Sequence, residues 1–303
     1  MEVVVTGASG LIGQALVTIL EARGDRVRRL VRRPVADPSE IRWDPDRGHL
    51  NPAALVGVEA VVHLAGAGIA DRRWTRSQMN RILESRTRGT QLLARSLAKA
   101  RPLGGPKVLV SGSAIGFYGD RGEEALTEAS PRGTGFLADV CVAWEDATRD
   151  AERAGLRVAH ARTGIVLARS DGLLARLLPL FQVGLGGRIG SGRQFMSWIS
   201  LTDEVAALAW MIDNDVAGPV NLVAPGAVTN TEFSRTLGKV LRRPARLPVP
   251  PLGPALLYGR HLVRELMLAS TLVLPGVLGG GNFQFAHPSL NEALVKTIRG
   301  SAA

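Results

Sequence analysis

Residues 3–13 read VVVTGASGLIG, three valines followed by a glycine-rich turn and the start of an apolar, helix-like pattern. Gly7, Gly10 and Gly13 have the spacing G-x-x-G-x-x-G. Such glycines permit a tight turn, a close backbone approach to a pyrophosphate, and packing of a helix on a strand. The following helix would direct its N-terminus at the phosphate charge. The motif predicts a dinucleotide-binding loop formed by Gly7, Ser9, Gly10, Leu11, Ile12 and Gly13.

The segments that follow this loop alternate between strand and helix patterns. The predicted strands are 3–6, 26–31, 58–65, 107–113 and 156–162, and the predicted helices are 11–23, 75–100 and 135–154. Strand, helix, strand repeated along a chain is typical of a parallel sheet with helices on both faces. The sequence therefore predicts an α/β fold with a doubly wound parallel sheet of the Rossmann type.

The last quarter of the chain has a different pattern. We predict a proline-rich linker or rigid turn at 246–254, a helix over 255–271, a break at Pro275, a short strand at 282–286 and a final helix. Ser289 and Glu292 have the spacing of a capping box for this last helix. These features predict two parts: a dinucleotide-binding domain over 1–225, and a smaller substrate-side lobe over 226–303 that closes over the carboxyl edge of the sheet.

The end of the second predicted strand indicates which dinucleotide is bound. Asp25 precedes this strand and so lies at the edge of the sheet opposite the ligand. The carboxyl end instead presents Arg32 and Arg33, without an acidic residue that would repel a phosphate. Two guanidinium groups suit the 2′-phosphate of the cofactor, which they would hold with charge-assisted hydrogen bonds. The sequence therefore predicts NADP(H), with solvated arginines as the alternative interpretation.

Composition limits the class of protein and its setting. The chain has 303 residues, of which 46% are hydrophobic, so it can bury a sizeable core. Its single cysteine, Cys141, excludes an internal disulfide, and the five histidines show no metal-ligand spacing, so we expect no metal. No secretory leader is expected, since the chain starts with a strand pattern, and no apolar stretch is long enough to span a bilayer. These features predict a cytoplasmic protein without a membrane partner.

The formal net charge of +10 raises the question of a nucleic-acid partner. The sequence has only two tyrosines, no run of five basic residues, and no aromatic residues interleaved with a basic stretch. A scattered arginine-rich surface therefore explains the charge better than specific nucleic-acid binding. We expect a small-molecule substrate. A homodimer is compatible with the sequence, which does not fix the oligomeric state.

Three further segments resemble the extended short-chain dehydrogenase/reductase superfamily: HLAGAGI at 63–69, SRTRGTQLL at 85–93 and SGSAIGFYG at 111–119. The small residues of the first segment allow the backbone at Leu64, Ala65 and Gly66 to pass close to the adenosine and diphosphate. The resemblance implies that Arg86 occupies the place of an asparagine beside the cofactor. It also implies that Ser113 polarises a substrate carbonyl, although a hydroxyl at a strand end often only caps a turn.

Longer segments resemble a narrower group, the nucleoside-diphosphate-sugar epimerase family proteins of the YfcH type. These segments are GDRGEEALTEASPRGTGFLADVCVAWE, GSGRQFMSWISLTDE at 190–204, and LASTLVLPGVLGGGNFQFAHPSLNEAL at 268–294. Together they extend over almost the whole chain. The resemblance does not bring a defined substrate. Within the second segment, a glycine-rich loop presents Arg193 and Gln194, which we predict to contact the substrate.

The residues expected for proton transfer are absent from this sequence. Members of the superfamily use a tyrosine as general acid and a lysine four residues later, which lowers the tyrosine pKa. With Glu145 aligned to the glutamate that follows this motif, Leu137 and Cys141 occupy the two places. Tyr118 is followed four positions later by a glycine, and Tyr258 by a leucine. The standard pair is therefore missing.

Three functional hypotheses remain open at this point. The first is an NADP(H)-dependent oxidoreductase that acts on a small carbonyl or sugar-like substrate, with Ser113 and Tyr118 as candidate catalytic residues. The second is a non-catalytic protein that binds or senses NADP(H). The third, epimerisation of a nucleotide sugar, has the least support, because moving a hydride out and back ordinarily needs the missing acid and base.

Overall fold

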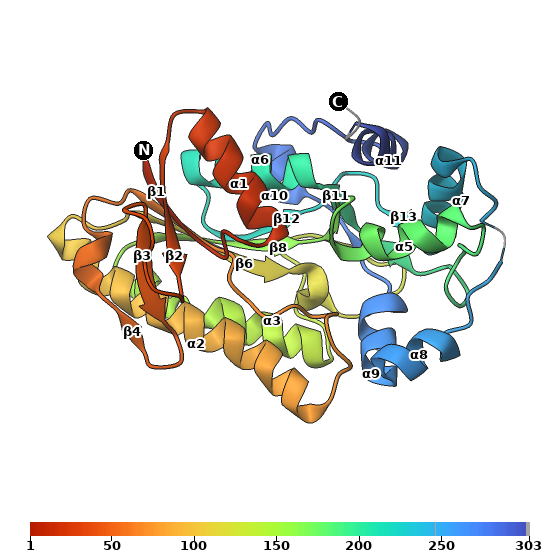
Figure 1. The fold of residues 1–303 in the computed structure, drawn as a ribbon, viewed down its shortest axis with the longest axis horizontal. Helices are drawn as coiled ribbons and strands as arrows, with labels where there is room; N and C mark the ends of the chain where they lie inside the picture. The colour runs from red at the N-terminus through yellow and green to blue at the C-terminus, as the bar shows by residue number, and fades with distance from the viewer. Residues whose placement is uncertain (246, 301–303) are drawn as a thin grey trace.

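The structure is a computed structural model that describes residues 1–245 and 247–300. An 8-stranded sheet runs through its centre in the order β12-β8-β6-β5-β1-β2-β3-β4 (Figure 1). Its strands are β1 Glu2–Thr6, β2 Arg26–Val31, β3 Glu40–Asp44, β4 His49–Leu50, β5 Ala60–His63, β6 Val108–Ala114, β8 Arg157–Thr163 and β12 Gly218–Leu222. All neighbouring strands are parallel except β3 and β4. The predicted parallel Rossmann sheet is confirmed, and β3, β4 and β12 extend it beyond the predicted strands.

The strand order reverses between β1 and β5, which lie side by side at the middle of the sheet. The chain runs outward from β1 through β2 to β3, and then returns to add β5, β6, β8 and β12 on the other side. In doubly wound sheets, ligands bind at the carboxyl ends of the strands beside this reversal. The turn between β1 and α1 is therefore the expected centre of the site.

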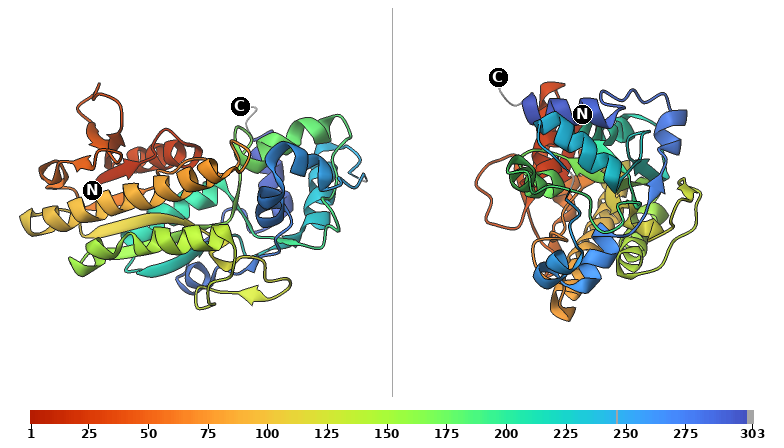
Figure 2. Two further views of the ribbon diagram at one scale, coloured as in Figure 1. Left: turned by 90° about the horizontal axis from the view of Figure 1, so that it is seen from below. Right: turned by 90° about the vertical axis from the view of Figure 1, so that its right-hand side faces the viewer.

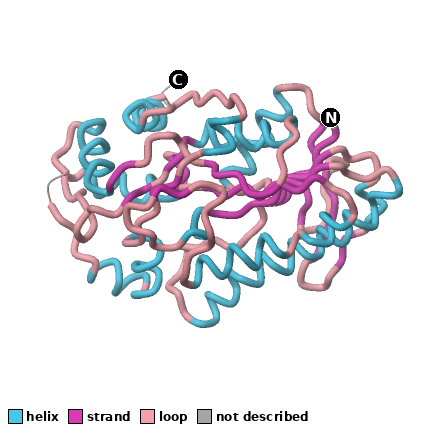
Figure 3. The backbone as a smooth tube through the Cα atoms, turned by 180° about the vertical axis from the view of Figure 1, so that it is seen from behind, coloured by secondary structure: helices cyan, strands magenta, loops and turns pink. Residues whose placement is uncertain are grey.

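Alternation along β1 explains why helices cover both faces of the sheet. Val3 and Val5 pack with Leu16 on one face, and Val4 packs with Leu93 on the other. The first face is covered by α1 Leu11–Ala22, α6 Leu201–Asp213 and α10 Gly276–Gly280. The second is covered by α2 Arg76–Ala100, α3 Phe136–Asp146 and α4 Arg149–Arg153. The strands form a layer between these helices in Figure 3.

A second lobe lies beside the sheet and has a core of its own (Figure 2). Its helices are α5 Gly172–Gln182, α7 Asn230–Leu241 and α11 Leu290–Arg299, and its short strands are β9 Ile165–Leu167, β10 Phe195–Met196, β11 Trp198–Ser200 and β13 Val228–Thr229. Leu174 and Trp198 pack in this core with Phe233 and Leu290. The lobe therefore includes chain from both sides of residue 225, and the division at 225/226 stays a prediction.

The helix predicted over 255–271 is confirmed only in part, because it is interrupted and ends at Met267. The chain instead forms α8 Leu252–Tyr258, α9 Arg260–Leu262 and a π-helical turn, η4, at Val263–Met267, followed by a strand, β14 Leu272–Val273, that pairs with β7 Ala125–Leu126. Gly259 separates α8 from α9 with φ +92°, outside the range of a right-handed helix. The apolar pattern could not reveal this break, and it did not report burial in α8 either, since Leu256 and Leu257 are exposed.

The strand predicted at 282–286 is also absent from the described chain. Asn282 has φ +59°, and the backbone N–H groups of Ala286 and His287 donate to the carboxylate of Asp203 rather than to a strand, over 2.7 and 3.1 Å. Phe283 and Phe285 pack edge to face, with their ring centroids 4.9 Å apart. A buried carboxylate thus replaces the hydrogen-bonding partner that the sequence pattern had suggested.

The remaining predictions need smaller corrections. The helix predicted over 135–154 is divided into α3 and α4, because the Thr148 hydroxyl donates to the Glu145 carbonyl and tightens the chain there. The last helix is confirmed, and Ser289 accepts from the backbone N–H of Glu292, which is half of the predicted capping box. Within the predicted linker, Arg246 lies outside the described residues. None of the described helices has the length and apolar character needed to cross a membrane.

Candidate cofactor and substrate site

The turn between β1 and α1 has room only for glycine at two of its positions. Gly7 has φ +68°, and a Cβ there would lie 2.8 Å from the backbone carbon of Leu64. A Cβ on Gly13 would lie 2.2 Å from the Gly7 carbonyl oxygen. Gly7 therefore allows the turn to approach the end of β5, and Gly13 allows α1 to start against the turn.

The same turn leaves hydrogen-bond donors open for a ligand. Gly10 is the N-cap of α1 and has no side chain that could accept from the first turn of the helix. The N–H groups of Leu11 and Ile12 precede the first intrahelical bonds, and neighbouring Ser9 is exposed. Open N–H groups at the positive end of a helix bind phosphate. The predicted loop residues therefore come together in an arrangement that fits a dinucleotide pyrophosphate.

The end of β2 differs from the prediction in one respect. Arg33 forms an ion pair with Glu40 on β3, and its Nη1 lies 2.8 Å from that carboxylate. The expectation that no acidic residue lies here is therefore wrong, because Glu40 on the neighbouring strand supplies one. Arg32 is exposed and, within the described chain, forms no ion pair. Of the two arginines, Arg32 is thus the one free to meet an anion.

Arg86 lies beside the segment that follows β5, at the predicted cofactor site, and with Trp144 it forms what we call the Arg86 wall. Its side chain lies beside Gly66, where a Cβ would come within 3.3 Å of the guanidinium carbon. Arg86 is 7% exposed and donates to the carbonyls of Ala67 and Ile82. Burial lowers its pKa, and among the described residues no carboxylate contacts it. A buried cation without a protein counter-ion suits a negatively charged ligand.

Trp144 adds an unsatisfied hydrogen-bond donor to this wall. The Arg86 guanidinium lies 4.9 Å from the centroid of the Trp144 ring, and the ring also packs against Gly112 at the end of β6. The indole Nε1 is buried and has no hydrogen-bond partner among the residues that the structure describes. Buried indole N–H groups ordinarily find an acceptor. The Arg86–Trp144 pair therefore fits a polar cofactor better than it fits a closed core.

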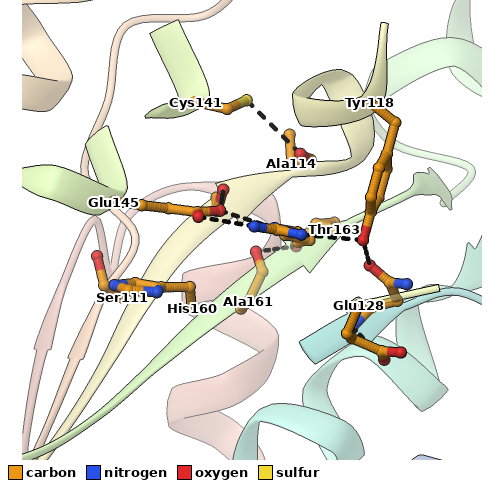
Figure 4. A network of polar contacts seen from close by, with 12 residues as sticks. Ser111, Ala114, Tyr118, Glu128, Cys141, Glu145, His160, Ala161 and Thr163 are labelled. Carbon is orange, nitrogen blue, oxygen red and sulfur yellow. Dashed lines mark hydrogen bonds and ion pairs between the residues drawn. The ribbon is translucent and has the colours of Figure 1, made fainter. Parts of the chain in front are cut away.

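A buried polar network joins the end of β6 to α3 and β8 (Figure 4). The Ser113 hydroxyl donates to Glu145 over 2.7 Å. Arg162 donates to both carboxylate oxygens of Glu145, over 2.8 and 2.9 Å. Burial alone would raise the pKa of Glu145, but the hydrogen bonds and charge of Arg162 hold it below its usual value. Glu145 is therefore an ionised carboxylate in contact with the Ser113 hydroxyl.

Tyr118 supports this network from the interior. It is 0% exposed, donates to the Asn221 side chain over 2.7 Å, and accepts from Arg162. Burial raises the pKa of the phenol. Its proton is already committed and the ring has no contact with solvent, which argues against Tyr118 as a proton donor, and this role stays a prediction. Ser113 stays the candidate of the two.

Leu137 and Cys141 lie on α3 against the same strand end. Leu137 is 8% exposed and Cys141 is 4% exposed, and both border Gly116 in the turn after β6. Burial raises the pKa of the Cys141 thiol to about 12, and its sulfur lies 3.5 Å from the Ala114 carbonyl oxygen. The thiol is therefore a packing group at pH 7. Neither side chain can replace a phenol or an ammonium group.

Of the two predicted substrate contacts, Gln194 is buried and Arg193 is exposed. Gln194 is 6% exposed, and its amide donates to the carbonyls of Ile189 and Met267. Its donors are used to hold two loops together, which argues against substrate binding, and this role stays a prediction. Arg193 is exposed, and its role in binding stays a prediction. The described residues contain no group of three or more His, Cys, Asp or Glu side chains that could hold a metal.

Three charged residues near the site were not predicted from the sequence: Arg162, Glu204 and Glu265. Arg162 stands in the apolar strand pattern LRVAHAR, which is the signal that could have found it. Glu265 comes from η4, and its carboxylate accepts from the N–H groups of Phe136 and Leu137 over 3.1 and 2.9 Å. It thereby anchors the N-terminus of α3, the helix that carries Glu145.

Glu204 is a buried acid at the start of α6, beside the carboxyl end of β8. Thr163 donates to one of its oxygens over 2.8 Å, and the other oxygen has no partner in the described chain. Burial raises the pKa of Glu204 to about 8. The side chain is therefore protonated and neutral at pH 7.

We expect Glu204 to make stability fall as pH rises. The native protein keeps this proton up to about pH 8, whereas the unfolded chain releases it near 4.5. The contribution of Glu204 to the free energy of unfolding is therefore complete below about pH 4.5. It is lost as the pH rises toward about 8, by about 1.4 kcal/mol per pH unit. Urea unfolding between pH 6 and pH 7.5 should show a loss of about 2 kcal/mol that Glu204→Gln reduces. An unchanged slope in this variant would contradict a buried, protonated Glu204.

Known proteins share this arrangement of elements. A model of the NAD dependent epimerase/dehydratase family matches residues 3–224. Epimerase family protein Mb2239 of Mycobacterium bovis is 44% identical over 293 residues, which cover 96% of this chain and 96% of that protein. Human epimerase family protein SDR39U1 is 35% identical over 303 residues, with 98% of this chain and 100% of that protein covered.

A solved structure matches over nearly the whole chain. The crystal structure of human SDR39U1, isoform 2, with NADPH has a TM-score of 0.90 and 34% identity, and the match covers 99% of each chain. These matches confirm the resemblance of the sequence to the epimerase-family group of extended short-chain dehydrogenases/reductases. The chain belongs to the NAD dependent epimerase/dehydratase family, as an atypical extended short-chain dehydrogenase/reductase.

Proposed function

We propose that the protein binds NADP(H) at the carboxyl edge of the sheet. The glycine turn and the open N–H groups of α1 would hold the pyrophosphate, and Arg32 would contact the 2′-phosphate. Arg86, buried without a counter-ion, would face the remaining part of the cofactor. The human relative crystallised with NADPH supports this proposal, since it matches at 34% identity over 99% of the chain.

Arg32→Ala is expected to weaken NADPH binding by about 1–2 kcal/mol, because a charge-assisted hydrogen bond contributes about 1.5–3 kcal/mol and exposure reduces that. NADH binding should hardly change, since NADH has no 2′-phosphate. Isothermal titration calorimetry with both cofactors measures the difference. Arg26→Ala is the matched control, because it removes the same charge from the amino end of the same strand. Equal losses for NADPH and NADH would exclude the 2′-phosphate as the partner of Arg32.

The function that the site supports best is oxidoreduction at a hydroxyl or carbonyl carbon. The observation that carries this proposal is the 2.7 Å hydrogen bond from Ser113 to the ionised Glu145. Because Ser113 uses its proton in this bond, its free lone pairs can accept a proton from a substrate hydroxyl. Ser113 would then pass its own proton to Glu145. Bound NADP(H) supplies or accepts the hydride.

Arg162 determines the preferred direction of this proton transfer. It keeps Glu145 ionised and therefore ready to accept a proton, which is what oxidation of an alcohol requires. Reduction of a carbonyl would need Glu145 to be protonated first, so it should speed up as pH falls. The expected activity is therefore NADP⁺-dependent oxidation of a small alcohol, with the reverse reaction favoured in acid.

Turnover of a panel of small secondary alcohols and their ketones tests this proposal. Ser113→Ala and Glu145→Gln should each lower kcat by about 10²- to 10⁴-fold, the usual contribution of general acid–base catalysis. NADPH affinity should stay unchanged, which separates lost chemistry from lost folding. Tyr118→Phe is the control, because it removes a hydroxyl of the same network without touching Glu145. Full turnover in Ser113→Ala would exclude the Ser113–Glu145 route.

Binding of NADP(H) without catalysis is the second candidate function. The apolar Leu137 and the inert thiol of Cys141 favour it, because they occupy the places of the usual acid and its charged neighbour. Wild-type protein that binds NADPH but turns over none of the panel in either direction would support this alternative. Epimerisation of a nucleotide sugar retains the least support, for the same reason.

A further inference from the structure

A basic pocket lies in the second lobe, away from the predicted cofactor site. Its volume is about 560 Å³, within the range of small-molecule sites. The lining residues are Arg188, Thr231, Ser234, Arg235, Gly238, Lys239, Arg242, Arg243 and Ala245. None of them belongs to the glycine turn, the end of β2 or the Arg86 wall. In Figure 1, α7 lies at the edge of the molecule opposite β1 to β3.

The shape of the pocket follows from α7 and the turn after it. Thr231, Arg235 and Lys239 recur every four residues and so share one face of the helix. Arg242 ends the helix with φ 55°, and the N–H of Arg243 then donates to the Gly238 carbonyl over 2.9 Å. This turn carries the chain back across the helix. A Cβ on Gly238 would lie 2.7 Å from the Ala245 Cβ atom, so the glycine lets this turn pack closely against α7.

The side chains that line the pocket carry positive charge and no negative charge. It contains five arginine or lysine side chains and no Asp or Glu. Across residues 1–245 and 247–300, none of these five forms an ion pair with a carboxylate. Glu232 is the acid of α7 adjacent to this face, and its carboxylate is used by Thr229 in a complete capping box.

Hydroxyl groups complete the polar lining. Thr231 donates its hydroxyl proton to the Gly192 carbonyl over 2.9 Å, so its oxygen lone pairs stay available. Ser234 lies one turn further along α7 and is 3% exposed. Clustered cations repel one another, and this repulsion is relieved when a multiply charged anion binds among them. Guanidinium groups form bidentate bonds with phosphate in particular.

We propose that this pocket is a second ligand site, which binds a small molecule carrying two or more phosphate groups. Each phosphate monoester has a charge of about −1.5 to −2 at pH 7, so two or three such groups balance the five cations. The concave shape favours a compact ligand over a nucleic-acid duplex, which needs an extended basic surface. The site is independent of the proposed chemistry at Ser113.

In the test, inorganic pyrophosphate is titrated into the whole protein, and its binding is measured by isothermal titration calorimetry. We expect a dissociation constant below about 1 mM at 150 mM salt, with NADPH present to occupy the cofactor site. Arg235→Gln with Lys239→Gln should weaken this binding at least about tenfold. Both side chains are exposed, so the double variant should fold normally.

Arg81→Gln with Lys107→Gln is the matched control. Both side chains are exposed, and the change in net charge is the same. The control should leave pyrophosphate binding within about twofold of the parent. Equal losses in both double variants would show that only the overall charge attracts the anion, and this would overturn the proposal. No binding of pyrophosphate by the parent would overturn it as well.

Two further arms identify the source of the phosphates and the class of ligand. A sugar bisphosphate and a nucleoside diphosphate are titrated in turn, and whichever binds more tightly than pyrophosphate identifies the group that carries the phosphates. A DNA duplex that binds the parent more tightly than all three compounds, and loses this affinity in the pocket variant, would replace the small-molecule proposal with a nucleic-acid surface. Retained NADPH affinity in the pocket variant is required, because the two sites are separate.

Discussion

Arg162→Met is expected to destabilise the folded protein by about 3–5 kcal/mol at pH 7, because it leaves the Glu145 carboxylate buried without its counter-ion. Arg162 is 4% exposed and donates to both carboxylate oxygens of Glu145 as well as to the Tyr118 hydroxyl. Its guanidinium also lies 3.5 Å from the centroid of the Phe117 ring. Urea unfolding of parent and variant measures the loss.

The double variant Arg162→Met with Glu145→Gln is the control for this interpretation. It removes the buried charge together with its partner, so it should recover a substantial part of the lost stability. The single variant should also be less impaired at low pH, since burial then raises the pKa of the unpaired Glu145 and the acid becomes neutral. A loss below about 1 kcal/mol in the single variant would mean that the pair is no more than a surface-type ion pair.

Gly13→Ala is expected to abolish measurable NADPH binding and to destabilise the fold by about 1–3 kcal/mol, the usual effect of overpacking. The added Cβ would lie 2.2 Å from the Gly7 carbonyl oxygen and 2.8 Å from the Ala8 Cα atom. Both are backbone atoms, so the clash cannot be relieved by a rotamer change. The turn and the start of α1 would have to move apart, and this would displace the open N–H groups.

Gly279→Ala provides a matched control for this substitution. A Cβ at Gly279, within α10, meets no atom within 4 Å, and no positive φ is required there. Its NADPH affinity and unfolding free energy should match those of the parent. Calorimetry and urea unfolding of both variants give the comparison. Normal NADPH binding by Gly13→Ala would show that the cofactor does not use this turn.

The sheet and its first turn could be predicted because the deciding interactions are local. Val3, Val4 and Val5 form a strand that is buried on both faces, and the glycine spacing directly after them fits only a tight strand-to-helix turn. The period of the apolar residues in 75–100 likewise corresponds to α2, whose bounds are Arg76–Ala100. Such patterns survive in a single sequence because neighbours along the chain are neighbours in space.

The C-terminal elements could be predicted only in part. The final helix was found because Leu290–Arg299 has a regular apolar period and a serine cap. The strand expected at 282–286 failed because its hydrogen bonds go to Asp203, which lies more than 80 residues earlier. An alternating apolar pattern reports which side chains are buried. It does not report which group accepts from the backbone.

The sequence by itself determined the doubly wound sheet, the glycine turn for a dinucleotide and the absence of the tyrosine–lysine pair. Only the tertiary structure decided which polar groups meet at the end of β6, because Ser113, Glu145 and Arg162 come from three separate elements and become a network only when β6, α3 and β8 pack together. The structure likewise paired Arg33 with Glu40, confined Tyr118 to the interior and gathered five cations around α7. Charge and burial depend on distance in space, and a pKa or a ligand site therefore follows from packing that the order of residues does not specify.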